Sequence, residues 1–141
     1  MTWKIGLSAE LVRKITEQDV EHFAKLSGDN NPIHMKEMKS KDGFWEKPIV
    51  HGMFIGGLVS NVIGTQMPGE GTIYMEQNMQ FVKPVFVDDK VRVVVEVSDI
   101  IKPQKGILRL NTTVYNQKEE CVMEGYAVVK VPVKSDDEEN K

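Results

Sequence analysis

With 141 residues and 40% apolar content, the chain is long enough for one domain with its own hydrophobic core. Its 18 basic and 21 acidic residues give a net charge of −3, which argues against a nucleic-acid-binding protein, and its single cysteine, Cys121, excludes an intrachain disulfide and a multi-cysteine metal cluster. No segment approaches the ~20 consecutive apolar residues that cross a bilayer and the N-terminus lacks the layout of a signal peptide, so we expect a soluble, cytoplasmic protein that does not act at a membrane.

A strand over 9–15 and a helix over 17–27 are the first predicted elements. Thr16 suits the N-cap of this helix, and Asp19, three residues later, can complete a capping box. Gly28 follows the last helical residue, where a left-handed conformation ends many helices. The residues that recur at helical spacing on its expected buried face are Val20, Phe23 and Ala24.

The next segment, residues 29–34, is predicted to be a stiff loop. It reads Asp-Asn-Asn-Pro-Ile-His, and its first four residues are turn formers. Pro32 fixes its own φ and pushes Asn31 out of the helical region. A short, exposed helical turn is predicted to follow over 35–41.

A second helix is predicted over 49–64, preceded by Pro48. This segment contains no charged residue, and a helix that is apolar on every side is expected to be buried on every side. Gly52, Gly56 and Gly57 each cost ~1 kcal/mol relative to alanine inside a helix. We therefore expect another backbone segment or a ligand to approach this helix closely.

Long strands are predicted for the rest of the chain, over 73–83, 90–100, 106–116 and 121–132. Their apolar residues alternate with polar ones, which is the period of a strand with one buried face. The short turns between them favour an antiparallel meander. The residues expected on the inner face are Ile73, Met75, Met79 and Phe81, then Val91, Val93, Val95 and Val97, then Leu108, Leu110, Thr112 and Val114, and finally Cys121, Met123, Ala127, Val129 and Val131.

This order of elements predicts an α+β fold of the hotdog type, in which a curved antiparallel sheet wraps around a long, apolar central helix. We expect one domain over 1–133, followed by an acidic, disordered tail over 134–141. One such sheet leaves part of the helix and the strand edges uncovered. A second copy would cover them, so we expect at least a homodimer.

The segment 29–34 and the start of the second helix also carry a candidate reaction site. Asp29, Asn31 and His34 place a carboxylate, an amide and an imidazole on one rigid support, which suits acid–base chemistry. Gly52 lies at the N-terminus of the helix, where unpaired N–H groups and the helix dipole favour negative charge on an oxygen. Taken alone, the loop is also ordinary turn chemistry, and the ring of His51 can simply bond a neighbouring carbonyl.

Several blocks of the sequence resemble one known family. The segment 23–34, Phe-Ala-Lys-Leu-Ser-Gly-Asp-Asn-Asn-Pro-Ile-His, resembles the hydratase-2 motif of MaoC-like hotdog proteins. The segment 44–53, Phe-Trp-Glu-Lys-Pro-Ile-Val-His-Gly-Met, resembles the approach to the central helix of that family. The segments 67–74 and 81–89 resemble its turn into the sheet and its following strand and turn. The resemblance runs in collinear order over residues 8–132.

The resemblance implies an (R)-specific enoyl-CoA hydratase, or a dehydratase acting on 3-hydroxyacyl thioesters in the reverse direction. Asp29 and His34 match the catalytic pair, and Asn31 matches the amide that helps to hold the water. Gly52 matches the residue whose N–H polarises the thioester carbonyl, and Ser60 falls where some relatives have a serine near the acyl pocket. The resemblance also implies a homodimer, and no metal or redox cofactor beyond the CoA or carrier group of the substrate.

Two other functions stay open on the sequence: a hotdog acyl-CoA thioesterase and a non-catalytic subunit that binds acyl thioesters. The carrier of the acyl group is also open. Lys83, Lys102 and Lys105 are candidates for contacts with CoA, but an acyl carrier protein would use a basic patch too.

Overall fold

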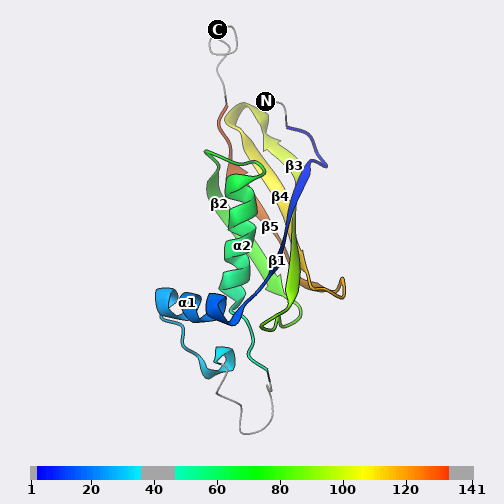
Figure 1. The fold of residues 1–141 in the computed structure, drawn as a ribbon. Helices are drawn as coiled ribbons and strands as arrows, with labels where there is room; N and C mark the ends of the chain where they lie inside the picture. The colour runs from blue at the N-terminus through cyan, green and yellow to red at the C-terminus, as the bar shows by residue number, and fades with distance from the viewer. Residues whose placement is uncertain (1–2, 36–46, 134–141) are drawn as a thin grey trace.

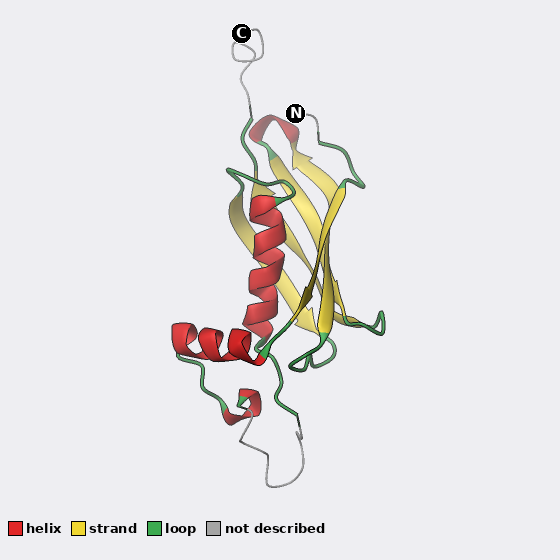
Figure 2. Ribbon diagram, in the orientation of Figure 1, coloured by secondary structure: helices red, strands yellow, loops and turns green. Residues whose placement is uncertain are grey.

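The structure is a computed structural model that describes residues 3–35 and 47–133. A five-stranded antiparallel sheet curves around one face of a central helix, and a second helix lies crosswise at the end where the central helix begins (Figures 1 and 2). The elements are β1 (Ser8–Lys14), α1 (Glu17–Ser27), η1 (Pro32–His34), α2 (Gly52–Thr65), β2 (Ile73–Phe81), β3 (Lys90–Lys102), η2 (Pro103–Lys105), β4 (Ile107–Tyr115) and β5 (Cys121–Lys130). This arrangement confirms the predicted α+β class.

The apolar residues that alternate along β3 and β4 lie on the inner face of the sheet, as predicted. The core formed by these two strands and α2 consists of Val91, Val93, Val95, Val97, Leu108, Leu110, Val114, Ile55, Leu58, Val59, Val62 and Ile63. Thr112 is also fully buried in this face. Burial of each large aliphatic side chain contributes about 1.5–3 kcal/mol, so this layer is the main stabilising contact between the sheet and α2.

The ends of α1 are those that the sequence predicts. Oγ1 of Thr16 accepts from the amide of Asp19 (3.1 Å), and Oδ2 of Asp19 accepts from the amide of Thr16 (2.9 Å), which completes the capping box. Gly28 ends the helix with φ at 81°, in the left-handed region. Val20 is the buried residue of α1, and Phe23 and Ala24 are partly buried.

The strand order differs from a simple meander. The order across the sheet is β1-β3-β4-β5-β2, so β2 pairs with β5 and not with β3, its successor in the chain. Only β3, β4 and β5 follow one another as a meander, and β1 completes the other edge. After β2, at one edge of the sheet, the chain has to cross to β3, which lies next to the opposite edge. The alternation of residues within a strand does not reveal this crossing.

The predicted inner face of β2 is wrong in its first half. A bulge between Tyr74 and Glu76 inserts one extra residue, so Ile73 pairs with Lys130 and lies on the outer side. After the bulge, Met79 and Phe81 lie on the inner side, as predicted. A single added residue shifts every preceding side chain to the opposite face, because strands have a period of two.

The central helix starts later than predicted. Ile49 forms an isolated antiparallel bridge with Phe86, and the amide of Val50 donates to the carbonyl of Val85 (2.7 Å). These two residues are therefore extended, and α2 begins at Gly52.

The prediction that this helix is buried on every side is also wrong for the single chain. The sheet covers one face, and the opposite face is exposed, with the Met53 side chain 60% accessible. The other exposed residues of α2 include Gly57, Ser60, Asn61 and Gly64.

Two of the helix glycines do lie against another segment. A Cβ on Gly52 would lie 2.9 Å from Cζ of Phe81, and a Cβ on Gly56 would lie 3.0 Å from Sδ of Met79. Gly57 has no such neighbour within 4 Å. The close neighbours at these two positions are side chains of β2, and not the backbone segment or ligand that the sequence led us to expect.

The helical turn predicted over 35–41 falls almost wholly outside the described residues, as does the tail predicted over 134–141. Within residues 3–35 and 47–133, none of the helices combines the length and apolar character required to span a bilayer.

Candidate active site

Three hydrogen bonds tie the predicted loop to the segment that leads into α2. The amide of Ile49 donates to the carbonyl of Ile33 (2.9 Å), and the carbonyl of Ile49 is bonded to Nδ1 of His34. Nε2 of His51 is bonded to the carbonyl of Asp29 at 3.0 Å, although the two residues are 22 positions apart. The loop and the N-terminus of α2 therefore form one structural unit.

Side chains within the loop fix its shape. Oδ1 of Asp29 accepts from the amide of Asn31 (3.2 Å), and Oδ1 of Asn31 accepts from the amide of Ile33 (3.2 Å) at the start of η1. These are the bonds by which Asp and Asn stabilise turns. The turn uses one oxygen of each side chain, so Oδ2 of Asp29 and Nδ2 of Asn31 are the atoms left for other contacts.

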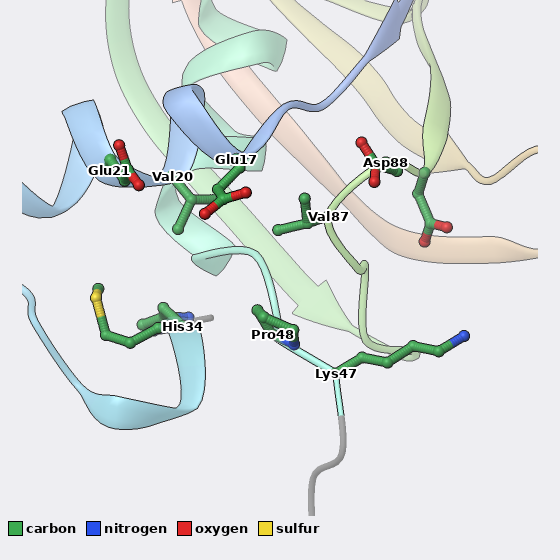
Figure 3. Close-up of a pocket in the computed structure, with 10 residues that line it drawn as sticks. Glu17, Val20, Glu21, His34, Lys47, Pro48, Val87 and Asp88 are labelled. Carbon is green, nitrogen blue, oxygen red and sulfur yellow. The ribbon is translucent and has the colours of Figure 1, made fainter. Parts of the chain in front are cut away.

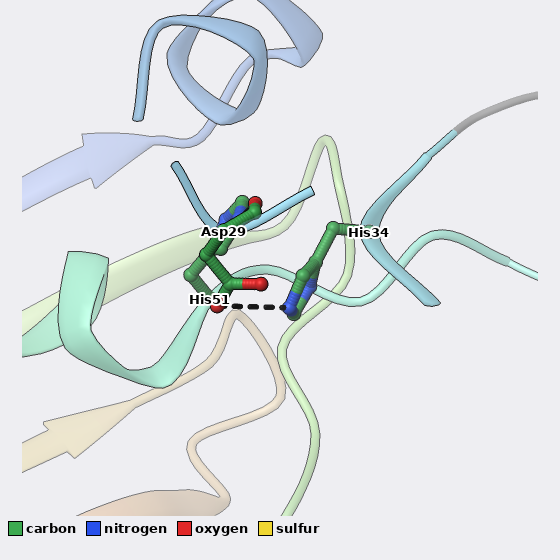
Figure 4. A group of neighbouring side chains, drawn as sticks. All are labelled: Asp29, His34 and His51. Atoms are coloured by element: carbon green, nitrogen blue, oxygen red, sulfur yellow. Dashed lines mark hydrogen bonds and ion pairs between the residues drawn. The ribbon is translucent and has the colours of Figure 1, made fainter. Parts of the chain in front are cut away.

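Asp29 and His34 lie side by side, as the sequence predicts. Oδ2 of Asp29 is 3.9 Å from Nε2 of His34 (Figure 4). The Asp29 side chain is 52% exposed and the His34 side chain 10%. Because a carbonyl oxygen only accepts, Nδ1 of His34 carries the hydrogen in the bond to Ile49, and Nε2 of the neutral ring keeps its lone pair. A carboxylate oxygen and an imidazole nitrogen thus face the same small space.

His51 belongs to this cluster, although the sequence predicted no role for it in the site. Its ring is 2% exposed and stacks on the ring of His34, with 3.7 Å between centroids and 23° between planes. The ring of Phe23 covers it at 4.8 Å. Its position directly before Gly52 is the one sequence signal that could have identified it. The predicted bond to a neighbouring carbonyl is confirmed, and the acceptor is Asp29.

Gly52 is the first residue of α2, so its amide has no carbonyl one turn earlier within the helix. The helix dipole places partial positive charge at this end. The bond from His51 to Asp29 brings the loop to the same end of α2. The structure therefore brings Asp29, Asn31, His34 and Gly52 together in one region.

Ser60 lies elsewhere in the single chain. It is exposed on the outer face of α2, eight residues and about 12 Å along the axis from Gly52. The candidate lysines are also dispersed. Lys83 is paired with Glu120, whereas Lys102 and Lys105 lie around η2, at the other end of α2 from η1 (Figure 2).

A pocket of about 570 Å³ opens beside His34, between α1 and the turn that precedes β3 (Figure 3). Pro48 and Val87 contribute apolar surface. Its charged lining is mainly acidic, and Lys47 is the basic residue. The acidic residues are Glu17, Glu21, Asp88 and Asp89. Such a lining disfavours a phosphate group and accepts neutral or cationic groups more readily.

Asp29, His34 and His51 offer possible metal-ligand atoms within 4.8 Å of one another. The two imidazole rings are stacked face to face, however, so the lone pairs in their planes run beside each other and do not converge on one point. Metal ligation by histidine uses these in-plane lone pairs. The cluster therefore fits proton transfer better than metal binding.

Comparisons with known proteins identify the family of the chain. The family described as "MaoC like domain" matches residues 4–119. The chain is 39% identical over 133 residues to 3-hydroxybutyryl-CoA dehydratase of Methylorubrum extorquens, covering 94% of this chain and 83% of the relative. It is 39% identical over 129 residues to (R)-specific enoyl-CoA hydratase of Aeromonas caviae, covering 92% and 96%.

The fold is shared with solved structures of such proteins. The (R)-hydratase from A. caviae superposes with a TM-score of 0.87 at 38% identity, covering 93% of this chain and 98% of the other. R-hydratase PhaJ1 from Pseudomonas aeruginosa superposes with a TM-score of 0.84 at 35% identity, covering 94% and 84%. The family match over most of the length, the identity to these relatives and the shared hotdog fold lead to one conclusion: the chain belongs to the MaoC-like family.

Proposed function

We propose that the protein catalyses the reversible hydration of trans-2-enoyl thioesters, with enoyl-CoA as the substrate, to (R)-3-hydroxyacyl thioesters. The observation that carries this proposal is the Asp29–His34 pair, held by hydrogen bonds against the N-terminus of α2 at Gly52. The relatives are named enoyl-CoA hydratase and 3-hydroxybutyryl-CoA dehydratase, and these activities support the same reaction.

The spacing of the pair suits a bound water molecule. A distance of 3.9 Å is too long for a direct hydrogen bond between Oδ2 of Asp29 and Nε2 of His34. It is short enough for one water oxygen to lie at about 2.8 Å from both atoms. In our proposal, Nδ2 of Asn31 helps to orient this water.

The water oxygen then bonds to C3 of the enoyl group, and the pair takes up the proton that the water loses. The π electrons move to the thioester oxygen, where the Gly52 amide and the α2 dipole stabilise the enolate. A proton from the pair is then delivered to C2. One oxyanion donor contributes about 3–4 kcal/mol to such a barrier, and acid–base transfer about 10²–10⁴-fold in rate. No electrons are gained or lost, so we propose a reaction without a redox cofactor.

We also propose that the enzyme acts as a homodimer of the domain over 1–133. The exposed face of α2 and the neighbouring edge strand β2 support this, because both present apolar side chains to solvent in the single chain. These side chains are Met53, Ile73, Met75 and Phe81. A second copy would bury them, and it would place Ser60 at the interface, where it could line an acyl site.

The test is hydration of crotonyl-CoA, followed as loss of the conjugated thioester absorbance, with the configuration of the product determined by chiral analysis. We expect (R)-3-hydroxybutyryl-CoA, and a loss of at least about 10²-fold in turnover for Asp29→Asn and for His34→Ala. His22→Ala and Asp99→Asn, which change exposed residues of the same types, serve as controls and should keep full activity. Unchanged turnover in both site variants would remove the proposed mechanism. Release of free thiol from saturated acyl-CoA would instead identify a thioesterase.

A further inference from the structure

His51 contacts three separate parts of the proposed site. Its Nε2 is bonded to the backbone carbonyl of Asp29, and its ring face lies on the ring of His34. Its own carbonyl accepts from the amides of Phe54 and Ile55 and so starts α2. The next residue is Gly52. One buried side chain thus connects the proposed acid–base pair to the proposed oxyanion donor.

The hydrogen bond determines which nitrogen of the His51 ring carries the hydrogen. The carbonyl of Asp29 can only accept, so Nε2 is the donor, and the neutral ring has a bare lone pair on Nδ1. This Nδ1 is buried and has no hydrogen-bond partner within the described part of the chain. Buried polar atoms without a partner are rare in proteins, and where they persist they call for a functional or structural reason.

The helix itself does not supply that reason. His51 occupies the N-cap of α2, but its side chain makes no capping bond. Asn, Asp, Ser and Thr are the residues that stabilise this position. His51 is a poor N-cap and leaves a buried nitrogen unpaired. The contacts made by its other ring atoms therefore explain its presence better than capping does.

We propose that His51 is the positioning residue of the active site. Its Nε2–H fixes the backbone of Asp29, its neutral ring face fixes the plane of His34, and its place in the chain fixes both relative to the amide of Gly52. This inference rests on the proposed function. Positioning of this kind matters because reacting groups displaced by about 1 Å can lose on the order of 10² in rate.

The ring of His51 lies at the N-terminal end of α2 and against the ring of His34. The neutral ring of Phe23 on α1 also contacts the His51 ring, with 4.8 Å between the centroids. Asp29 from the loop lies 3.9 Å from His34, and the other charged residues that line the pocket beside His34 are Glu17 and Glu21 from α1, Asp88 and Asp89 from the turn before β3, and Lys47.

Two amide variants separate positioning from simple structural support. In His51→Gln the side-chain amide nitrogen can occupy the place of Nε2 and keep the bond to Asp29. In His51→Asn the amide is one bond too short to reach that place, whereas asparagine is the better N-cap. The positioning role therefore predicts a higher kcat for His51→Gln than for His51→Asn. The capping role predicts a higher melting temperature for His51→Asn than for His51→Gln.

The measurements are kcat and KM for crotonyl-CoA and the melting temperature of each variant, beside the wild-type protein. We expect kcat of His51→Asn to fall below that of His51→Gln by on the order of tenfold or more, with KM changed by less than about threefold in both. Equal kcat values, or kcat values that follow the melting temperatures, would overturn the positioning role. A wild-type protein that does not hydrate the substrate would instead refute the proposed function.

A second measurement uses the folded wild-type protein alone. Nitrogen-15 NMR of the histidine rings distinguishes the two neutral tautomers and the charged form. We expect the neutral ring of His51 to carry its hydrogen on Nε2, with Nδ1 bare. A neutral ring with its hydrogen on Nδ1 would contradict the bond to Asp29 and overturn the inference, whatever the activity of the variants.

Discussion

The first residue of α2, Gly52, lies against the ring of Phe81 on β2, so that a Cβ at position 52 would lie 2.9 Å from Cζ of the ring. The glycine therefore has a packing reason to be there, besides the proposed role of its amide. Phe81 is half exposed, so its ring has room to move if it is pushed. The two reasons can be separated by experiment.

Gly52→Ala should lower kcat/KM for crotonyl-CoA by about 10², because the added methyl group crowds the approach to the amide. It should lower the free energy of unfolding by less than about 1 kcal/mol, because the Phe81 ring can move aside. In the double variant with Phe81→Leu, thermal denaturation should show the stability regained and kinetics should show the activity still lost. Full recovery of kcat/KM in the double variant would mean that the glycine serves only to accommodate Phe81.

Asn31→Asp should leave the loop intact but lower turnover. Aspartate can still accept from the amide of Ile33 at the start of η1, so thermal denaturation should show little change. The donor Nδ2 is lost, and with it the proposed contact to water, so we expect a fall in kcat of about tenfold or more. Asn30→Asp, the same change at the exposed neighbouring position, is the matched control. Equal activities of the two variants would exclude a role for the Asn31 amino group.

Gly125→Ala should destabilise the sheet severely. A Cβ at this position of β5 would lie 1.9 Å from the carbonyl oxygen of Asn78 on β2, so the backbone of one strand must move. We expect a loss of about 3 kcal/mol or more in the free energy of unfolding, measured by denaturant titration. Glu124→Ala, an exposed change in the same strand, should stay within about 0.5 kcal/mol. A loss of less than about 1 kcal/mol for Gly125→Ala would show that β2 can shift at little cost.

Met53→Glu should separate the proposed homodimer. Met53 is exposed on the face of α2 that the sheet leaves uncovered, so a charge there would have to be buried if a second copy covers this face. Analytical ultracentrifugation should show a dimeric wild-type protein and a largely monomeric variant. Val12→Glu, at an exposed position of β1, should stay dimeric. A wild-type protein that sediments as a monomer would contradict the proposal.

Alkylation of Cys121 should be slow at neutral pH. Burial raises the pKa of this thiol, and the nearby Glu124 carboxylate raises it further. A raised pKa lowers the thiolate fraction at any given pH, so the iodoacetamide reaction of the folded protein should be slower than that of the unfolded protein and should accelerate only at higher pH. In Glu124→Gln, the rise of the alkylation rate with pH should occur at lower pH. Equal rates in the folded and unfolded states would contradict this.

Local features of the sequence were sufficient for much of the fold. Thr16 and Gly28 define the ends of α1, and alternating valines identify the inner face of β3. Asp29 and Asn31 form the turn that brings His34 beside the carboxylate. These features depend on caps, turns and side-chain period, which act over a few neighbouring residues, and so they can be read from one sequence.

Other features depend on which distant segments meet. The pairing of β2 with β5, the bulge after Tyr74 and the extended backbone of Ile49 follow from hydrogen bonds to segments far along the chain. The contacts of the His51 ring with the Asp29 carbonyl and with the His34 ring are of the same kind, since they require the loop to close onto α2. Which segments pair is decided by the free energy of the whole packed chain, and local preference carries no information about it.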